Sequence, residues 1–102
     1  MNIFYQLQGV QFEWDNNKAQ YNQAKHGISF EEATEVFFDP FYQEGDAIPL
    51  ENSNIEQREF ILGYSLEQRL LLVVYTERNN RNRIISARLA TPNERKLYEQ
   101  SG

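Results

Sequence analysis

The most regular hydrophobic pattern of the chain lies in its last third. Leu70 to Glu77 is a run of aliphatic and β-branched residues, and Arg83 to Leu89 alternates apolar with polar side chains. The segment between them is rich in asparagine, a residue that tolerates turn geometry, at Asn79, Asn80 and Asn82. The pattern predicts two β-strands joined by a tight polar turn, and we expect this hairpin to form the centre of the fold.

Two short helices are predicted in the first half of the chain. Asn16 to Lys25 follows the N-cap residue Asp15, and Gly27 is the residue type that ends a helix in the left-handed conformation. An S-x-x-E capping box at 29 to 32 then starts a second helix, expected from Phe30 to about Phe38. Because only a short link separates them, the two helices should form a compact pair.

The remaining elements are less regular. Residues 58 to 65 alternate in the manner of a strand whose two faces are both partly covered. A threonine cap, a proline at the first helical position and a capping glutamate predict a last helix over Pro92 to Gln100. Residues 2 to 7 fit either a short strand or an arm, residues 41 to 44 leave a short strand open, and residues 45 to 57 favour a loop.

These elements predict an α+β fold with two N-terminal helices, an antiparallel sheet of three to four strands and a C-terminal helix. The length predicts a single domain over residues 1–102, with residues 1–11 as an arm or extra strand. If Glu77 opposes Arg83 across the hairpin, Arg83 and Arg88 start on opposite faces of the sheet. A bulge, a strand end or an edge position would then be needed to bring both arginines to one site.

Composition excludes several kinds of site. The chain has no cysteine and one histidine, which excludes a disulfide framework, a thiol nucleophile and a histidine-rich metal site. We therefore expect neither a metal nor a cofactor. The N-terminus lacks the features of a signal peptide, and no apolar stretch approaches the ~20 residues that cross a bilayer. A soluble cytoplasmic protein without a membrane partner is expected.

Charge is distributed unevenly along the chain. The net charge of −5 argues by itself against a nucleic-acid partner. Residues 1 to 67, however, contain three basic residues against twelve acids, whereas residues 68 to 98 contain seven basic residues against two acids. Two explanations stay open, namely a basic working face on an acidic body, or arginines that pair with the acids of the first half.

The candidate chemistry is that of phosphate groups. No glycine-rich phosphate loop, paired-histidine metal motif or G-x-S-x-G sequence is present. Arginine can hold a phosphate oxygen bidentately and stabilise a phosphorane-like transition state. RNA supplies its own nucleophile, the 2′-hydroxyl, and His26 has the intrinsic pKa for proton transfer. The alternatives are that His26 and Lys25 only serve the helix dipole and that Arg83 only pairs with Glu77.

Several motifs together resemble one family, the BrnT toxins. They occur in family-like order and spacing over residues 12 to 99, and the first eleven residues lie outside them. The motifs are FEWD at 12–15, KHGISFEEA at 25–33, FDP at 38–40 with acids following, Glu56 and Arg58, LLLVVYTER at 70–78, RIISAR at 83–88 and ATPNERKLYE at 90–99. The resemblance implies a RelE-like α+β fold and a metal-independent endoribonuclease, the toxin of a type II toxin-antitoxin module. It also implies RNA as substrate and a BrnA-like antitoxin as partner, with a possible heterotetramer and with operator DNA bound only through the antitoxin.

The resemblance also suggests the site. The family's basic positions fall on Lys25, His26, Arg58, Arg83 and Arg88, which we interpret as catalytic. Arg78 is expected to bind RNA, and so is Arg81, to which the resemblance assigns no role. Two other functions stay open: an inactive toxin-fold module that acts only by binding its antitoxin or nucleic acid, and a small structural domain whose arginines offset the acidic first half.

Overall fold

The computed structural model describes residues 1–47 and 57–101, which form a six-stranded sheet with three α-helices and one short 3-10 helix. In chain order the elements are β1 (Asn2–Leu7), β2 (Val10–Asp15), α1 (Asn16–His26), α2 (Phe30–Glu35), the 3-10 helix η1 (Val36–Phe38), β3 (Gln43–Ala47), β4 (Arg58–Tyr64), β5 (Leu70–Arg78), β6 (Arg81–Leu89) and α3 (Pro92–Ser101). Within these ranges, no helix has both the length and the apolarity that crossing a membrane requires.

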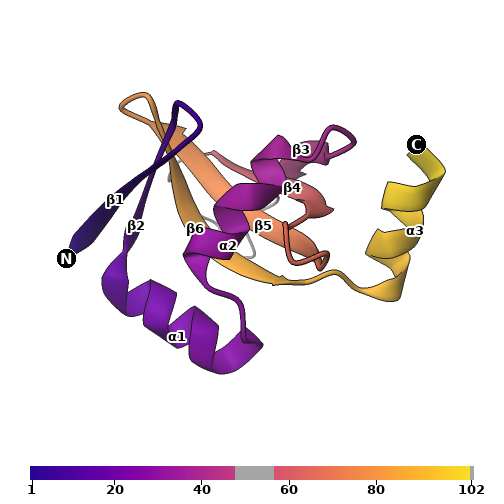
Figure 1. Cartoon of the computed structure of the whole chain (residues 1–102), viewed down its shortest axis with the longest axis horizontal. Helices are drawn as coiled ribbons and strands as arrows, with labels where there is room; N and C mark the ends of the chain where they lie inside the picture. The colour runs from indigo at the N-terminus through magenta and orange to yellow at the C-terminus, as the bar shows by residue number, and fades with distance from the viewer. Residues whose placement is uncertain (48–56, 102) are drawn as a thin grey trace.

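The sheet has the strand order β1-β2-β6-β5-β4-β3. Neighbouring strands are antiparallel except β2 and β6, which run parallel. Helix α2 crosses one face of the sheet, α1 lies beside β6, and α3 stands at the far end, near β4 (Figure 1). The α+β class and the three predicted helices are therefore present.

The sheet is larger than the three to four antiparallel strands expected from the sequence. Gln8 and Gly9 both have positive φ angles, 49° and 83°, and form the tight turn that pairs β1 with β2. Residues 2–7 are thus a strand, and β2 is a strand that the sequence pattern did not indicate. Strand β3 extends to Ala47, inside the segment expected to be a loop; the rest of that loop, residues 48–56, lies outside the described residues.

The helix boundaries follow the predicted capping residues. The Asp15 carboxylate accepts from the backbone N–H of Lys18, and the Ser29 hydroxyl accepts from the N–H of Glu32, both at 3.0 Å. Gly27 adopts the left-handed conformation, with φ 73°. These caps place α2 over a core built from α2, η1, the link residue Ile28 and alternate positions of the strands, and Ala19 of α1 packs against this core. The buried members are Phe12, Trp14, Ile28, Phe30, Ala33, Val36, Ile61, Leu71, Val73, Tyr75, Ile84 and Ala87.

Helix α1 also covers an open edge of the sheet. Strand β2 pairs with β6 only at Asn82 and Arg83, which leaves the rest of β6 without a strand on that side. The buried Asn22 side chain takes the place of such a strand. Its amide donates to the carbonyl of Ala87 at 2.8 Å and accepts from the N–H of Ala87 at 3.1 Å, and it also donates to the carbonyl of Ile28.

The central hairpin differs from its predicted register by one residue. Glu77 opposes Asn82, and Arg83 opposes Thr76, so Arg83 is not the cross-strand partner of Glu77. The ladder shifts between Val74 and Tyr75, because Val74 opposes Ser86 and Tyr75 opposes Ile84. Ile85 is therefore an extra residue without a partner, a β-bulge that reverses the alternation of faces along β6.

Candidate functional site

The side of the sheet that α2 leaves uncovered carries many of the arginines, and we call it the outer face. Residues directly opposite each other in a ladder point to the same face. Arg83 lies opposite Thr76. Arg88 lies opposite Leu72, and Leu72 and Thr76 share a face because they are four residues apart on β5. The bulge at Ile85 thus brings Arg83 and Arg88 to one face, although five residues separate them.

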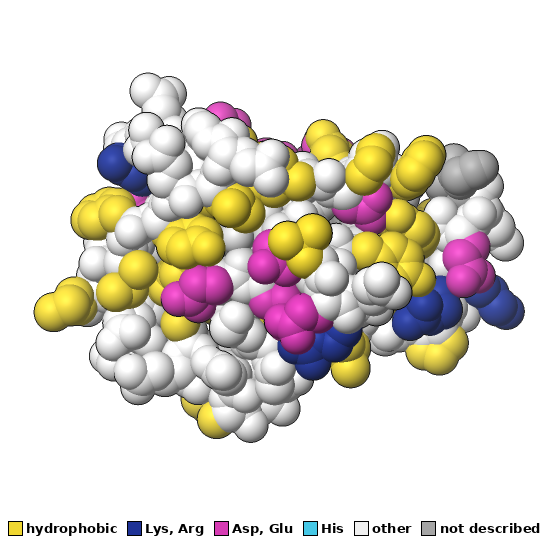
Figure 2. All heavy atoms as spheres, in the orientation of Figure 1, with side chains coloured by type: hydrophobic (Ala, Val, Ile, Leu, Met, Phe, Trp, Pro, Cys, Tyr) yellow, Lys and Arg dark blue, Asp and Glu magenta, His cyan; other side chains and the backbone are white. Residues whose placement is uncertain are grey.

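Two further arginines extend this row at the end of the hairpin. Arg81 is two residues before Arg83, so it points to the same face, and its partner across the hairpin is Arg78. The opposite, helix-covered side has a different charge. Figure 2 shows Asp and Glu side chains gathered at its centre over α2, with one Lys or Arg group directly below them and others at the right and upper left of the view. The uneven charge of the sequence therefore appears as a basic cluster on the outer face and an acidic α2 on the opposite side.

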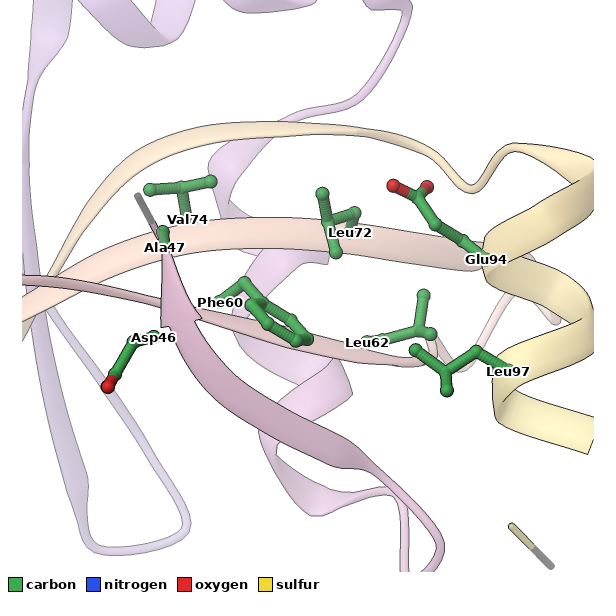
Figure 3. A pocket seen from close by; sticks show the side chains of 8 residues that line it. All are labelled: Asp46, Ala47, Phe60, Leu62, Leu72, Val74, Glu94 and Leu97. Carbon is green, nitrogen blue, oxygen red and sulfur yellow. The ribbon is translucent and has the colours of Figure 1, made fainter. Parts of the chain in front are cut away.

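An apolar pocket of about 360 Å³ lies on the outer face between β3, β4, β5 and α3 (Figure 3). Leu97 of α3 and Leu62 of β4 approach each other at one end, and Phe60 lies toward the other end. Arg58 is two residues before Phe60 on β4, so it belongs to the outer face as well. Among the described residues, Arg58 makes no ion pair. The complete lining is Asp46, Ala47, Phe60, Leu62, Leu72, Val74, Glu94 and Leu97.

Arg83 is held by an acid of the first half of the chain. Its guanidinium donates to the carboxylate of Glu13 on β2 at 2.8 Å and to the side-chain oxygen of Asn2 at 3.3 and 3.4 Å. The Glu13 side chain is only 7% exposed, and the Nε of Arg78 lies 3.8 Å from the same carboxylate oxygen. Glu13 is thus a shared counter-charge for two outer-face arginines, a role that the sequence analysis missed because it did not pair β2 with β6.

Arg88 has a partner of its own. Its two terminal nitrogens donate to the two carboxylate oxygens of Glu94 at 2.8 and 2.9 Å. This hydrogen-bonded pairing raises the pKa of Arg88 and lowers the pKa of Glu94. Glu94 also accepts from the N–H of Thr91, whose hydroxyl accepts from the N–H of Glu94, so the predicted capping glutamate anchors Arg88 to the start of α3.

Lys25 and His26 lie apart from the arginines, at the C-terminal end of α1. Lys25 is exposed, with its ammonium 5.8 Å from the centre of the Tyr21 ring, and His26 is half-buried. No hydrogen bond or ion pair among the described residues joins either side chain to an outer-face arginine. His26 is, however, one helical turn beyond Asn22, whose amide binds Ala87, the residue before Arg88. Both basic residues therefore sit near the edge of β6 that carries Arg88.

A buried polar cluster on the helix side was not expected from the sequence. Glu32, the glutamate of the predicted capping box, is only 4% exposed. It accepts hydrogen bonds from the Ser65 hydroxyl at 2.7 Å and from the Arg69 guanidinium, which also donates to the carbonyl of Gly27. The Arg69 hydrogen bonds, with that of Ser65, hold the pKa of Glu32 below its usual value despite burial. This cluster joins α2 to the β4–β5 turn and has no free group for chemistry.

The terminal helix is fixed by a second polar cluster at the end of the sheet. The Tyr98 hydroxyl donates to Asp39 at 2.6 Å, and the same carboxylate accepts from the backbone N–H of Tyr64. Burial opposes ionisation of Asp39, but these hydrogen bonds outweigh it and lower its pKa. Burial and the Asp39 hydrogen bond both raise the pKa of Tyr98. The pocket wall formed by Leu97 is therefore held in place by its neighbour Tyr98.

The site combines cationic groups in a row with an apolar floor, an arrangement that suits a polyanion carrying flat, partly apolar groups. Along β5, the partners of Arg83 and Arg88 are four residues apart, which corresponds to about 13 Å. Within the described residues, no group of three or more histidine, aspartate or glutamate side chains is placed to hold a metal ion. The chemistry available on the outer face is charge stabilisation by guanidinium groups.

Comparisons with known proteins agree with one another. The model of a family described as "Ribonuclease toxin, BrnT, of type II toxin-antitoxin system" matches residues 14–94. A crystal structure of the Brucella abortus ribonuclease toxin, BrnT, is similar in fold, with a TM-score of 0.55 and 22% sequence identity over 76% of this chain and 92% of that one. A search of curated proteins finds no match.

Proposed function

The chain belongs to the BrnT family of ribonuclease toxins of type II toxin-antitoxin systems, and from this premise we propose that it is a metal-independent endoribonuclease that arrests growth by cutting RNA. The observation that carries this proposal is the bulge at Ile85, which puts Arg83 and Arg88 on the same face as Arg58. A regular strand would separate two of these three charges. An extra residue that gathers them on an open face is expected where a polyanion binds.

The reaction we propose needs no external nucleophile. The 2′-hydroxyl attacks the adjacent phosphorus, a bond forms between O2′ and phosphorus, and the bond from phosphorus to the 5′-oxygen breaks. The 2′-hydroxyl proton leaves to a base, and the 5′-oxygen receives a proton, so the products are a 2′,3′-cyclic phosphate and a 5′-hydroxyl. The protein's task is to orient the strand, stabilise the charge on the phosphate oxygens and move protons.

Arg58, Arg83 and Arg88 are proposed to hold the scissile phosphate. A phosphate above Val74 and its partner Ser86 would lie about 7 Å along the strand from each of Arg83 and Arg88. An extended arginine side chain covers such a distance. Glu13 and Glu94 fix the direction of these two guanidinium groups, and a guanidinium has five N–H donors, so donors remain for a phosphate after the carboxylate is bound.

The other basic residues are proposed to act on the same RNA strand. Arg78 would contact phosphates beyond the end of the hairpin, and Arg81 would bind the same strand beside it. Lys25 and His26 would meet RNA that passes the edge of β6, with His26 as the proton-transfer group. Support for this position comes from the Asn22–Ala87 contact, which fixes the end of α1 beside the strand that carries Arg88.

A toxin of this family has an antitoxin as partner. We further propose that this antitoxin is BrnA-like, that the two proteins form a heterotetramer, and that operator DNA is bound only through the antitoxin. Three arginines of the outer face, Arg78, Arg83 and Arg88, already lie beside an acid. This pairing favours a second candidate function, in which the chain has lost catalysis and acts through the antitoxin or nucleic acid alone.

Tight induction of the chain in a bacterial host, with growth and total RNA followed together, tests the proposal. We expect growth arrest with fragmented RNA for the wild type, and loss of both effects for Arg83→Ala and Arg88→Ala. Arg95→Ala is a matched control, because Arg95 lies on α3 and binds the Tyr64 hydroxyl. Normal growth with intact RNA at high wild-type expression would contradict an enzyme. If a purified antitoxin still bound that protein, the second function would be supported.

A further inference from the structure

One part of the outer face lies outside the residues that match the family, on strand β1. The Phe4 ring is 61% exposed, and the guanidinium carbon of Arg81 lies over it, 4.9 Å from the ring centre. Beside this pair is a hollow of about 190 Å³ lined by Phe4, Tyr5, Gln6, Gln11 and Arg81. The hollow is therefore bounded by the cation–π pair of Phe4 and Arg81 and by the amide side chains of Gln6 and Gln11.

The strand register places these groups on the same face as the proposed phosphate site. Phe4 lies opposite Glu13, and Glu13 is the parallel-strand neighbour of Arg83. One step further along the strands, Gln6 lies opposite Gln11. The hollow is thus one strand away from Arg83, and a nucleic-acid strand bound along the arginines would pass beside it.

Folding does not account for the exposure of Phe4. The other face of β1 already supplies the core with Ile3, Tyr5 and Leu7, and the Tyr5 ring lies 5.4 Å from that of Trp14. Phe4 points the opposite way along the same alternation, into solvent. A large aromatic ring that is exposed to solvent and contacts one arginine resembles a stacking surface rather than part of a core.

We propose that Phe4 and Arg81 form a stacking subsite for one unpaired nucleobase of the RNA, with Gln6 and Gln11 reading the edge of that base. Aromatic rings and guanidinium planes stack on the faces of unpaired bases. Amide side chains offer one donor group and one acceptor group, which match the edges of bases. The subsite deepens the proposed ribonuclease function and rests on it, because it selects where the strand lies relative to Arg83.

Binding of a fluorescent single-stranded 2′-O-methyl RNA 12-mer to the purified protein tests this subsite. The probe lacks the 2′-hydroxyl and is not cut. Phe4→Leu keeps an apolar side chain but removes the stacking surface, and we expect roughly tenfold weaker binding. Phe41→Leu is the matched control, since Phe41 is equally exposed, at 64%, and does not line the hollow. Phe4→Trp keeps an aromatic ring at this position, so its binding should match that of the wild type rather than that of Phe4→Leu.

Two further measurements separate stacking from charge. Arg81→Lys keeps the charge and loses the plane, so it should weaken binding about as much as Phe4→Leu. The dependence of log Kd on log salt should keep its slope in Phe4→Leu, because no phosphate contact is lost, and should flatten in Arg83→Ala.

The outcomes for the subsite and for the proposed function are distinct. Suppose that the wild type binds and cuts RNA, and that Phe4→Leu and Phe41→Leu both bind the probe as tightly as the wild type. This result overturns the subsite and leaves the ribonuclease proposal intact. Full binding by Arg81→Lys also overturns it, since a phosphate contact would then explain Arg81. Wild-type protein that leaves unmodified RNA intact and does not bind the probe overturns the ribonuclease proposal.

Discussion

At the scale of single residues, Glu13 controls how much positive charge the outer face presents. It lies 2.8 Å from Arg83 and 3.8 Å from Arg78, and it is nearly buried between the strands. A carboxylate in this position orients the arginines but also competes with phosphate for them. The charge balance of the site is therefore set by an acidic residue of the FEWD motif, to which the sequence alone assigned no role.

The substitution Glu13→Gln should strengthen RNA binding. The amide oxygen can still accept a hydrogen bond from Arg83, while the competing negative charge is gone. We expect tighter binding of the 2′-O-methyl RNA probe, by about threefold to tenfold at low salt, with the gain shrinking as salt rises. Glu31→Gln, on the acidic helix side, is the control for the same change in net charge. Equal effects of the two substitutions would show that Glu13 acts only through overall charge.

Glu32 should make stability fall in acid. Its pKa in the folded protein is lowered, chiefly by the Arg69 hydrogen bonds, so the unfolded chain takes up the proton first as the pH decreases. The stabilisation is complete above the ordinary glutamate pKa of 4.5 and is lost as the pH falls through the lower value of the folded state. Thermal unfolding of the wild type and of Glu32→Gln between pH 7 and pH 3 measures this. The two melting temperatures should converge in acid, and a constant gap would contradict the assignment.

At the scale of elements, local sequence signals were sufficient to predict the helices but not to predict the whole sheet. Helix caps bond to residues only a few positions away in the chain, so the sequence pattern located both helices from Asp15, Gly27 and the Ser29–Glu32 box. Strand β2 was missed because its pairing with β6 connects residues about 70 positions apart in the chain. The bulge at Ile85 lies within the local β5–β6 pairing, where the sequence indicated only that a bulge, a strand end or an edge position was needed.

The same limit applies to the candidate site. Charge and turn position are local properties, and they singled out Arg78, Arg81, Arg83 and Arg88, all of which the structure places on the outer face. Arg58 lies on the same face but was identified from the resemblance. Glu13, Glu94 and Phe4 gained their roles only from strand register and from the start of α3. The grouping of Lys25 and His26 with the arginines came from the resemblance alone, and it stays a proposal.

Asn22 should be critical for the edge of β6. Asn22→Leu keeps the size of the side chain but leaves the N–H and carbonyl of Ala87 without their partner, at a cost of about 1–3 kcal/mol for each buried group. We expect a loss of about 2–4 kcal/mol in the free energy of unfolding, measured by urea denaturation. Gln23→Leu, exposed on the same helix, is the control and should change stability by less than about 0.5 kcal/mol. Faster hydrogen exchange at the Ala87 amide would localise the loss.

At the scale of the whole molecule, the uneven distribution of acidic and basic residues along the chain becomes an uneven distribution between the two sides of the sheet. Helix α2 comes from the acidic first half and gives the helix-covered side its acidic centre, while the β5–β6 hairpin carries arginines to the outer face (Figures 1 and 2). A net charge of −5 is therefore compatible with RNA binding, because phosphates would contact the basic outer face rather than experience the net charge of the whole molecule. The acidic side would in turn limit binding to nucleic acid in other orientations.

This separation gives a quantitative expectation for salt. When a protein binds single-stranded nucleic acid, log Kobs falls with log salt at about −0.7 per phosphate contact, because counterions are released. Three to four arginine–phosphate contacts therefore predict a slope of about −2.1 to −2.8. Measuring the slope with the RNA probe, and again with Arg58→Ala, Arg83→Ala and Arg88→Ala combined, checks it. The triple variant should flatten the slope by about 2, whereas Lys18→Ala, Arg95→Ala and Lys96→Ala combined should leave it unchanged although the net charge changes equally. If both triple variants flatten the slope alike, binding follows net charge, and the outer face is not where the phosphates lie.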